Sequence, residues 1–312
     1  MKEKNPVFSV VVPMYNEQET VGELYKRLSG VMDKTNEDWE LILVNDGSSD
    51  ETVARINDVR KKDKRVRLVN FARNFGQQAA VKAGLDYSEG QAVIVIDADL
   101  QDPPEVIYDL IEKWREGYEV VYAQRTKRIG ESKLKIWTAK LFYRIINKIT
   151  DIDLPLDTGF FRLIDRKVVK VINQMPERHR FFRALSIWVG FNQIAVPYER
   201  AERFAGETSY PLKKMIKLAV TAITGYSFWP LQMATYLGFI SSGISLLAIP
   251  AIIISRLTGS EEFLGQATTL IAVLFLGGVQ LIFLGIMGEY IGRIYDEVRG
   301  RPMYIVREDN EK

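Results

Sequence analysis

Two long apolar segments in the C-terminal third restrict what this chain can fold into more than any other feature. They run from about Gln232 to Ser255 and from about Ala267 to Met287, and residues 229–287 are almost free of charge. Each exceeds the roughly 20 residues that an α-helix needs to cross the core of a bilayer. The sequence therefore predicts two transmembrane helices; the alternative is a pair of core helices in a soluble protein.

Positive charges flank this pair of segments on both sides. The flanking cations are Lys213, Lys214 and Lys217 before it and Arg293, Arg299 and Arg301 after it. Because cytoplasmic loops carry the excess of Lys and Arg, the sequence predicts a multi-pass protein of the cell membrane whose remaining domain is cytoplasmic. Small residues on the second segment can pack against a helix of the same subunit or of a second copy, as in a homo-oligomer. They are Gly277, Gly278, Gly285 and Gly288.

The first two thirds of the chain alternate short β-branched runs with helical segments. Buried strands are predicted at 7–12, 41–44, 66–71 and 93–96, and further strands at 119–123 and 194–198. Apolar strands separated by helices are typical of a parallel sheet that is covered on both faces. The predicted fold is α/β: a Rossmann-like, mostly parallel sheet domain (1–210), an amphipathic juxtamembrane helix (211–230), two transmembrane helices (231–290) and a cytoplasmic tail (291–312).

Composition excludes several classes of function. The chain has no Cys and a single His, His179, so disulfides, thiolate metal sites, a Cys nucleophile and a His-cluster metal site are excluded. Lys and Arg number 42 against 40 Asp and Glu, and this balance does not indicate a nucleic-acid partner. No GxGxxG follows the first strand and no GxxxxGK[ST] occurs, so the two commonest nucleotide motifs are missing.

An acidic motif directly follows the fourth predicted strand: Asp97-Ala98-Asp99-Leu100-Gln101-Asp102. Open α/β sheets bind ligands at the carboxyl ends of their strands, so we expect Asp97, Asp99 and Gln101 to face a crevice. Carboxylates at every second residue can converge on Mg²⁺ or Mn²⁺ and leave positions open for phosphate oxygens. The alternative is that these acids are only turn and cap residues. We adopt it for Asp102, because the sequence Asp-Pro-Pro-Glu predicts a helix N-cap.

Two other loops carry polar residues at predicted strand ends. One is Pro13-Met14-Tyr15-Asn16-Glu17, where Asn16 is a plausible N-cap, and the other is Asn45-Asp46-Gly47-Ser48-Ser49-Asp50. For Tyr15 and Asn16, loop packing and capping are the alternatives to ligand contact.

The segments 11–17, 45–50 and 97–102 together resemble the inverting, GT-A-fold glycosyltransferases of family 2. Within that family the chain is similar to the polyprenyl-phosphate glycosyltransferases, which include dolichyl-phosphate mannose synthase and the bactoprenol glucosyltransferases. The resemblance covers about the whole chain. It implies that Pro13, Tyr15 and Glu17 cradle the nucleoside of a nucleotide-sugar donor and that Asp46 reads its base. It further implies that Asn16, Val44 and Ala98 border this site and that Asp97, Asp99 and Gln101 hold the metal on the diphosphate.

Basic residues near the acidic motif are candidates for phosphate binding. Arg125 lies at the carboxyl end of a predicted strand, and its guanidinium presents a bidentate fork to phosphate oxygens. Surface solvation is the alternative for both residues: it balances phosphate binding for Lys127 and has less weight for Arg125. The segment 133–149 combines an apolar stripe with a basic stripe at helical spacing. It predicts either a helix lying on an anionic membrane or an ordinary helix packed on the sheet.

The family resemblance also supplies residues near the acceptor. It implies that Asp157 lies beside the lipid phosphate, with Asp153 as the nearest alternative. A phosphate with a second pKa of about 6 is largely ionised at neutral pH and needs no strong base, so Asp157 orients groups or helps a remaining proton to leave. Residues 203–209 resemble the family's Arg-x-x-Gly-Glu-Ser-Lys loop, which assigns Arg203 to the closing loop. Ser209 stands where Lys is usual, so that role can pass to Lys213 or Lys214.

The resemblance implies metal-dependent, inverting transfer of a hexose from a nucleotide-sugar to polyprenyl phosphate. The interpretation is glucose from UDP-glucose and undecaprenyl phosphate, giving a β-linked product at the cytoplasmic membrane face among the lipids. GDP-mannose or an aminopentose donor are alternatives. A polymerising family 2 synthase is disfavoured because no Gln-x-x-Arg-Trp occurs. A membrane-anchored nucleotide-binding scaffold is disfavoured by the intact set of Asp97, Asp99 and Gln101.

Overall fold

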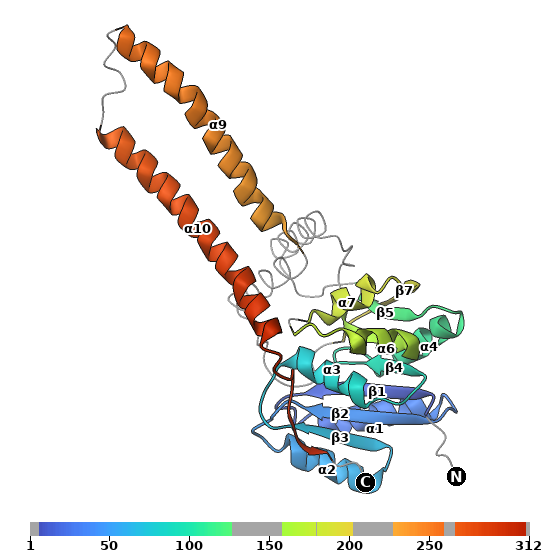
Figure 1. The fold of residues 1–312 in the computed structure, drawn as a ribbon. Helices are drawn as coiled ribbons and strands as arrows, with labels where there is room; N and C mark the ends of the chain where they lie inside the picture. Colours follow the sequence, from blue (N-terminus) through green and yellow to red (C-terminus); the bar gives the residue numbers. More distant parts are fainter. Residues whose placement is uncertain (1–5, 127–157, 179, 202–226, 259–265, 310–312) are drawn as a thin grey trace. The chain divides into compact units, whose positions relative to one another are not determined.

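The structure, a computed structural model, describes residues 6–126, 158–178, 180–201, 227–258 and 266–309 (Figure 1). These residues belong to two compact units. The first unit contains the β-sheet with its covering helices, and it includes the chain from Arg301 onwards. The second unit contains two long C-terminal helices.

The first unit is built on an eight-stranded sheet. Its strands are β1 (Phe8–Met14), β2 (Trp39–Asn45), β3 (Val66–Phe71), β4 (Ala92–Val95), β5 (Val120–Arg125), β6 (Thr158–Asp165), β7 (Gln193–Tyr198) and β8 (Val306–Asp309). Their order across the sheet is β7-β5-β6-β4-β1-β2-β3-β8. Strands β1 to β4 run parallel, and β5 is parallel to β7. Strand β6 is antiparallel to β4 and β5, and β8 is antiparallel to β3. The prediction of a mostly parallel, Rossmann-like α/β sheet is confirmed.

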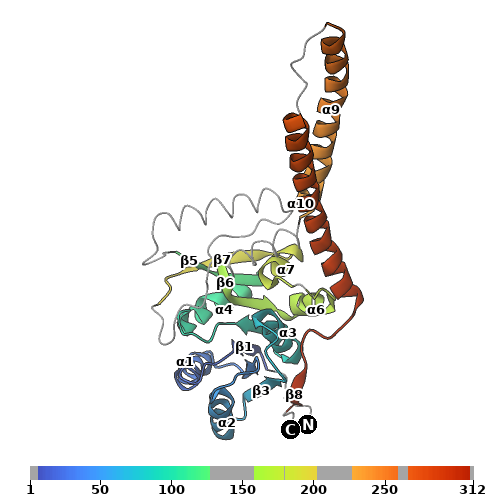
Figure 2. The same cartoon turned by 90° about the vertical axis from the view of Figure 1, so that its left-hand side faces the viewer.

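Helices cover both faces of this sheet (Figure 2). One face packs against α1 (Val21–Asp33), α2 (Thr52–Lys62), the short η1 (Pro104–Val106) and α4 (Ile107–Arg115). The other packs against α3 (Gln77–Tyr87), α6 (Arg166–Gln174) and α7 (Phe182–Trp188). Successive side chains of a strand point to opposite faces, so Val10 and Val12 of β1 join the first core and Val11 joins the second. This double cover explains why the strands read as continuous apolar runs.

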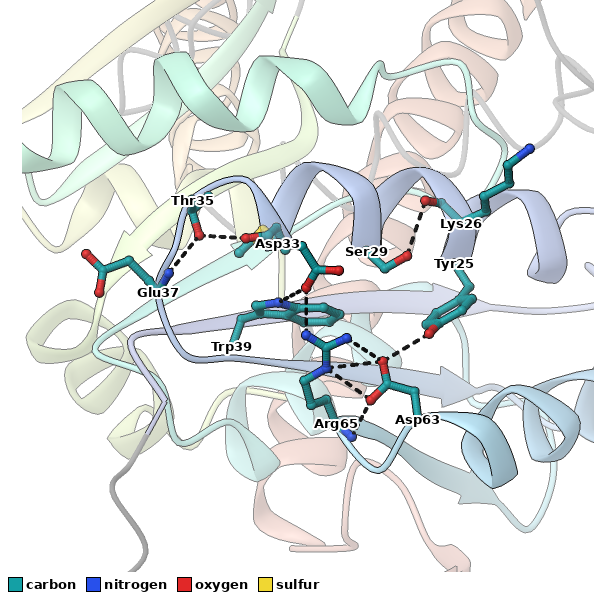
Figure 3. Close-up of polar contacts among 10 residues, drawn as sticks. Tyr25, Lys26, Ser29, Asp33, Thr35, Glu37, Trp39, Asp63 and Arg65 are labelled. Atoms are coloured by element: carbon teal, nitrogen blue, oxygen red, sulfur yellow. Dashed lines mark hydrogen bonds and ion pairs between the residues drawn. The ribbon is translucent and has the colours of Figure 1, made fainter.

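A polar network stabilises the sheet at the amino ends of β2 and β3 (Figure 3). Arg65 pairs with Asp63 at 2.8 Å and with Asp33 at 2.6 Å. Its guanidinium lies 4.0 Å from the ring centroid of Trp39, whose indole nitrogen donates to Asp33 at 3.0 Å. Tyr25 donates to Asp63 at 3.0 Å. The network therefore joins the last residue of α1 to the turns that enter β2 and β3.

The C-terminal segment differs from the tail predicted for 291–312. Residues up to Val298 continue the last long helix, and Val306–Asp309 form β8 at the edge of the sheet. The sequence Val-Arg-Glu-Asp contains a single apolar residue, so it has neither the alternation nor the β-branched run that predicts a strand. Its pairing depends on the exposed edge of β3, which sequence periodicity does not describe.

The second unit contains α9 (Trp229–Leu257) and α10 (Gln266–Val298). Their 29 and 33 residues give lengths of about 43 Å and about 50 Å, beyond the ~30 Å hydrocarbon core of a bilayer. The segments Trp229–Ala248 and Phe275–Val298 are apolar enough to cross a membrane, and none of their described residues is buried. Tyr290 donates to the Ser227 carbonyl at 2.7 Å, which joins the end of α10 to the start of α9. The alternative for these segments, a pair of buried core helices, does not agree with the exposure of their described residues.

We expect Asp63→Asn to destabilise the sheet unit, because it removes the charge-assisted bonds of Arg65. Hydrogen bonds from Arg65 are the largest cause that holds the pKa of Asp63 below its usual value. A depressed pKa adds stability above the unfolded-state value and loses it as the pH falls through the folded-state value. The expected loss is ~1–2 kcal/mol at neutral pH, or about 2–8 °C in Tm, and it shrinks in acid.

Thermal unfolding of the purified protein at two pH values measures this effect. Asp58→Asn is the matched control, because the Asp58–Lys61 pair on α2 is well exposed. Equal Tm values for Asp63→Asn and wild type would contradict the assigned role of the network.

We expect the full-length protein to stay with the membrane in high salt and to leave it only in detergent. Two apolar helices of this length bind through the hydrophobic effect, which salt does not weaken, whereas a surface bound by charge is released by screening. Washing membranes with 1 M salt, carbonate or detergent, followed by immunoblotting, measures the distribution. Complete release by salt alone would exclude a membrane hairpin.

Candidate active site

The parallel strands bring most of the predicted site residues to one edge of the sheet. Strands β1, β2, β4, β5 and β7 all run in the same direction, because β6 is antiparallel to both of its neighbours. The segment 13–17, Asp46, the segment 97–101 and Arg125 end or follow β1, β2, β4 and β5 respectively. The carboxyl edge is where open α/β sheets bind ligands.

Asn16 joins the loop after β1 to the loop after β2. Its side-chain oxygen accepts from the backbone nitrogen of Ser49 at 2.9 Å, and its own backbone nitrogen donates to Ser48 Oγ at 2.9 Å. The residue adopts a positive φ of 55°, a conformation that Asn tolerates better than most residues. The prediction that Asn16 caps α1 is wrong, because Thr20 holds the N-cap position. The adjacent Glu17 donates its backbone nitrogen to Thr52 Oγ1 at 2.8 Å.

The remaining residues of the predicted nucleoside site differ in accessibility. Tyr15 is 48% exposed, whereas Pro13 is buried within β1. Val44 lies in the core on the α3 face, and Ala98 lies in the core on the α1 face. Tyr15 is therefore the member of this group whose side chain offers a wide accessible surface.

Asp46 is a buried carboxylate that holds the loop after β3. It accepts from the backbone nitrogens of Phe75 at 2.6 Å and Gly76 at 2.9 Å. Burial raises its pKa, while these two donors and the charge of Arg73 oppose the rise. The structure thus assigns Asp46 a contact that the sequence did not suggest. Any contact with a base would use the lone pairs that these donors leave.

Asp97 and Asp99 lie close together after β4. Burial, followed by the charges of Asp102 and Asp99, raises the pKa of Asp97 to about 7. Gln77 donates to Asp97 Oδ1 at 2.8 Å, and Asp99 Oδ1 accepts from the backbone nitrogen of Gln101 at 3.1 Å. The site therefore concentrates negative charge that favours a bound cation.

The turn that carries these acids is held in an unfavourable backbone conformation. Leu100, between Asp99 and Gln101, has a φ of 56°, which is costly for a side chain of its size. Its side chain is buried in the core with Ala98. Burial of the Leu100 side chain thus offsets the backbone strain of the turn between Asp99 and Gln101.

Asp102 is fully buried and belongs to the site rather than to a helix cap. The prediction that it is an N-cap is wrong, since Pro103 occupies that position without a side-chain cap. Asp102 Oδ1 accepts from the hydroxyl of Tyr198 and lies 3.8 Å from Arg125 Nη2 and 3.5 Å from Arg200 Nε. Its Oδ2 has no hydrogen-bond partner among the described residues. A buried carboxylate needs such partners, and they come from strands that are distant in sequence.

Arg125 and Arg200 bring positive charge against the acids. Arg125 Nε donates to the Tyr198 hydroxyl at 3.1 Å, and Arg200 Nη2 lies 3.5 Å from Asp99 Oδ2. The structure thus places the predicted Arg125 at the site. Tyr198 and Arg200 are not among the site residues predicted from the sequence. Their position at the carboxyl end of the last predicted strand, 194–198, is the signal that could have identified them.

The donor set at this edge fits a hard divalent cation. Among the described residues no three His, Cys, Asp or Glu side chains converge as a complete metal site. Mg²⁺ typically needs only one or two protein carboxylates, because waters and substrate phosphates fill its remaining positions. Asp97 and Asp99, which follow β4 with one residue between them, meet that requirement.

Several predicted residues lie outside the described part of the chain. They are Asp157, Arg203, the basic segment 133–149 and Lys213, Lys214 and Lys217. Their assignments stay predictions.

A family model described as glycosyl transferase family 2 matches residues 9–172. The uncharacterized glycosyltransferase YkcC of Bacillus subtilis (strain 168) is 50% identical over 300 residues, or 96% of this chain and 93% of the relative. The uncharacterized glycosyltransferase sll0501 of Synechocystis sp. is 47% identical over 96% of this chain and 94% of the relative. The SfII prophage-derived bactoprenol glucosyl transferase of Shigella flexneri is 43% identical over 97% of this chain and 98% of the relative.

We expect Asp102→Asn to destabilise the protein, because it leaves Arg125 and Arg200 without their shared buried counter-charge. Loss of one partner of a buried pair costs ~3–5 kcal/mol, and the partial exposure of both guanidinium groups and the contact of Arg200 with Asp99 reduce this to about 2–3 kcal/mol. Thermal unfolding measures the change against Asp109→Asn, an exposed acid on α4. An unchanged Tm for Asp102→Asn would show that this carboxylate does not hold the arginines.

Proposed function

The chain belongs to glycosyl transferase family 2, and from this premise we propose that it transfers glucose from UDP-glucose to a polyprenyl phosphate. The transfer inverts the anomeric carbon and gives a β-linked polyprenyl-phosphate sugar. One observation carries the proposal: similarity to a bactoprenol glucosyl transferase extends over 97% of this chain and 98% of the relative. It therefore includes the apolar helices as well as the nucleotide-binding fold.

The donor half of the site follows from the charges at the carboxyl edge. Tyr15 and the loop held by Asp46 bind the nucleoside, and Asp97, Asp99 and Gln101 would hold Mg²⁺ or Mn²⁺ beside the diphosphate. A divalent cation bound there supplies Lewis-acid neutralisation of the charge on the departing diphosphate. Arg125 and Arg200 add positive charge, and their contacts with Asp102 and Asp99 orient both guanidinium groups.

The acceptor half of the reaction requires little proton chemistry. An ionised oxygen of the lipid phosphate attacks the anomeric carbon, and the bond from that carbon to the diphosphate oxygen breaks on the opposite side. Since the nucleophile is already an oxyanion, the residues near it need only orient it and balance its charge. We assign this orienting role to Asp157, with Arg203 on the loop that closes over the substrates.

The apolar helices account for the choice of a lipid acceptor. A hairpin formed by α9 and α10 keeps the enzyme at the surface where the phosphate headgroup of a polyprenyl lipid is exposed. The excess of cations on both flanks of the hairpin supports a cytoplasmic sheet unit, on the side where nucleotide-sugars are made.

The test is transfer of label into lipid by purified full-length protein in detergent. Undecaprenyl phosphate is supplied with labelled UDP-glucose, GDP-mannose or UDP-galactose in separate reactions containing Mg²⁺ or Mn²⁺. We expect label in the organic phase from UDP-glucose, and NMR of the product should show the β-anomer. Label from GDP-mannose alone would overturn the donor assignment, and no lipid label from any donor would overturn the proposed reaction.

Metal removal and Asp99→Ala test the assigned acids in the same assay. Chelation by EDTA should abolish transfer, and restored Mg²⁺ or Mn²⁺ should recover it. Asp99→Ala should lower turnover by at least about 100-fold while its Tm stays near that of wild type, with Asp109→Asn as the exposed control. Activity that persists in EDTA would refute the metal role.

A further inference from the structure

We propose that the side chain of Tyr304 and the backbone of residues 305–309 are a positioning element of the nucleotide site. They fix the loop after β3, which in turn closes on Asp46. This inference rests on the proposed function in one respect: the Asp46 loop binds the nucleoside of the donor.

The C-terminal segment contacts the end of β3 through side chains and backbone. The rings of Tyr304 and Phe71 stack with centroids 5.0 Å apart and planes at 12°. The Tyr304 hydroxyl donates to Asp86 of α3 at 2.8 Å. The backbone nitrogen of Ala72 donates to the carbonyl of Ile305 at 2.9 Å. Tyr304 is therefore fixed to both the strand and the helix between which the loop runs.

The regular pairing of β3 with β8 is interrupted at this contact. Pairing of β3 with β8 shifts register between Asn70 and Phe71, so the chain leaves the regular ladder where Tyr304 covers it. The loop then packs on the same aromatic ring, because Phe75 meets Phe71 edge-on at 5.7 Å. Arg73 lies 4.1 Å from the ring centroid of Phe75. Phe71 thus transmits the position of Tyr304 to the loop.

The loop has little freedom where it meets the nucleotide side. The backbone nitrogens of Phe75 and Gly76 are the donors that satisfy buried Asp46. A Cβ on Gly47, which has a φ of 68°, would overlap the backbone of Arg73 and Asn74. A shift of the loop would therefore leave the Asp46 carboxylate partly unsatisfied and would open a gap at Gly47.

A merely protective role for β8 makes a different prediction. Edge strands expose unpaired backbone groups, and covering them prevents aggregation and adds stability. If the role is only protective, loss of these contacts lowers the thermal stability and does not affect donor binding more than acceptor binding. If the segment positions the nucleotide loop, its loss instead weakens nucleotide binding. Acceptor binding and the turnover of bound substrates then stay intact.

Three variants of the full-length protein separate these roles. Tyr304→Ala removes the ring stack and the bond to Asp86, whereas Tyr304→Phe retains the stack. Ile305→Ala is the matched control, because this side chain is 52% exposed and the variant keeps the backbone carbonyl that Ala72 uses. Isothermal titration of each detergent-solubilised protein with UDP, and in parallel with GDP, measures nucleotide affinity. Initial rates give KM for donor and acceptor and kcat, and Tm reports folding.

We expect Tyr304→Ala to raise the Kd for UDP and the KM for the donor roughly three- to tenfold, which is the range that loss of an aromatic stack gives. The acceptor KM and kcat should stay unchanged, Tyr304→Phe should be affected at most about twofold, and Ile305→Ala should match wild type. Wild-type affinity in Tyr304→Ala would overturn this inference and leave the proposed function standing, as would equal effects on donor and acceptor. Failure of the wild type to bind UDP or GDP would overturn both.

Discussion

A fully buried carboxylate, Asp102, is the interaction on which the site depends. Its negative charge is stable in the interior only because Tyr198, Arg125 and Arg200 surround it, and these residues end or follow two other strands. Asp97 and Asp99 lie near Asp102, so the guanidinium groups of Arg125 and Arg200 balance three carboxylates. Burial of Asp97, together with the charges of Asp102 and Asp99, raises the pKa of Asp97, and the remaining negative charge suits a bound cation.

The charged groups at the two edges of the sheet differ in how well their partners satisfy them. At the amino edge, Arg65 satisfies Asp33 and Asp63 and covers Trp39, so every member of the network has partners. At the carboxyl edge, acids crowd one another, Leu100 holds a costly φ, and Asp102 keeps one oxygen without a described hydrogen-bond partner. These unfavourable contributions to the folding free energy at the carboxyl edge require a well-packed sheet. The two apolar cores provide it.

The features that depend on short stretches of sequence, namely the strands and the residues at their ends, could be predicted. Continuous apolar strands gave the parallel sheet, and residues at their carboxyl ends gave Asp46, Asp97, Asp99 and Arg125, because parallel strands end at one edge. Asp102 was misread since an Asp before two prolines has the pattern of a cap, and only the distant Tyr198 and Arg200 reveal its burial. The polar strand β8 was missed for a similar reason: its pairing depends on the free edge of β3 and not on its own pattern. Tertiary contacts between distant segments decided each of these cases.

The position of β8 changes how the domains of this chain are understood. The sheet unit includes the chain from Arg301 onwards, after the end of α10 at Val298. The two apolar helices are therefore inserted between strands of one sheet and are not an anchor appended to a finished domain. A chain that ended before residue 301 would leave β3 as an open edge and Phe71 without the ring that stacks on it. Because residues 299–305 join α10 directly to β8, the segment that leaves α10 is the one that completes the sheet beside the loop that satisfies Asp46.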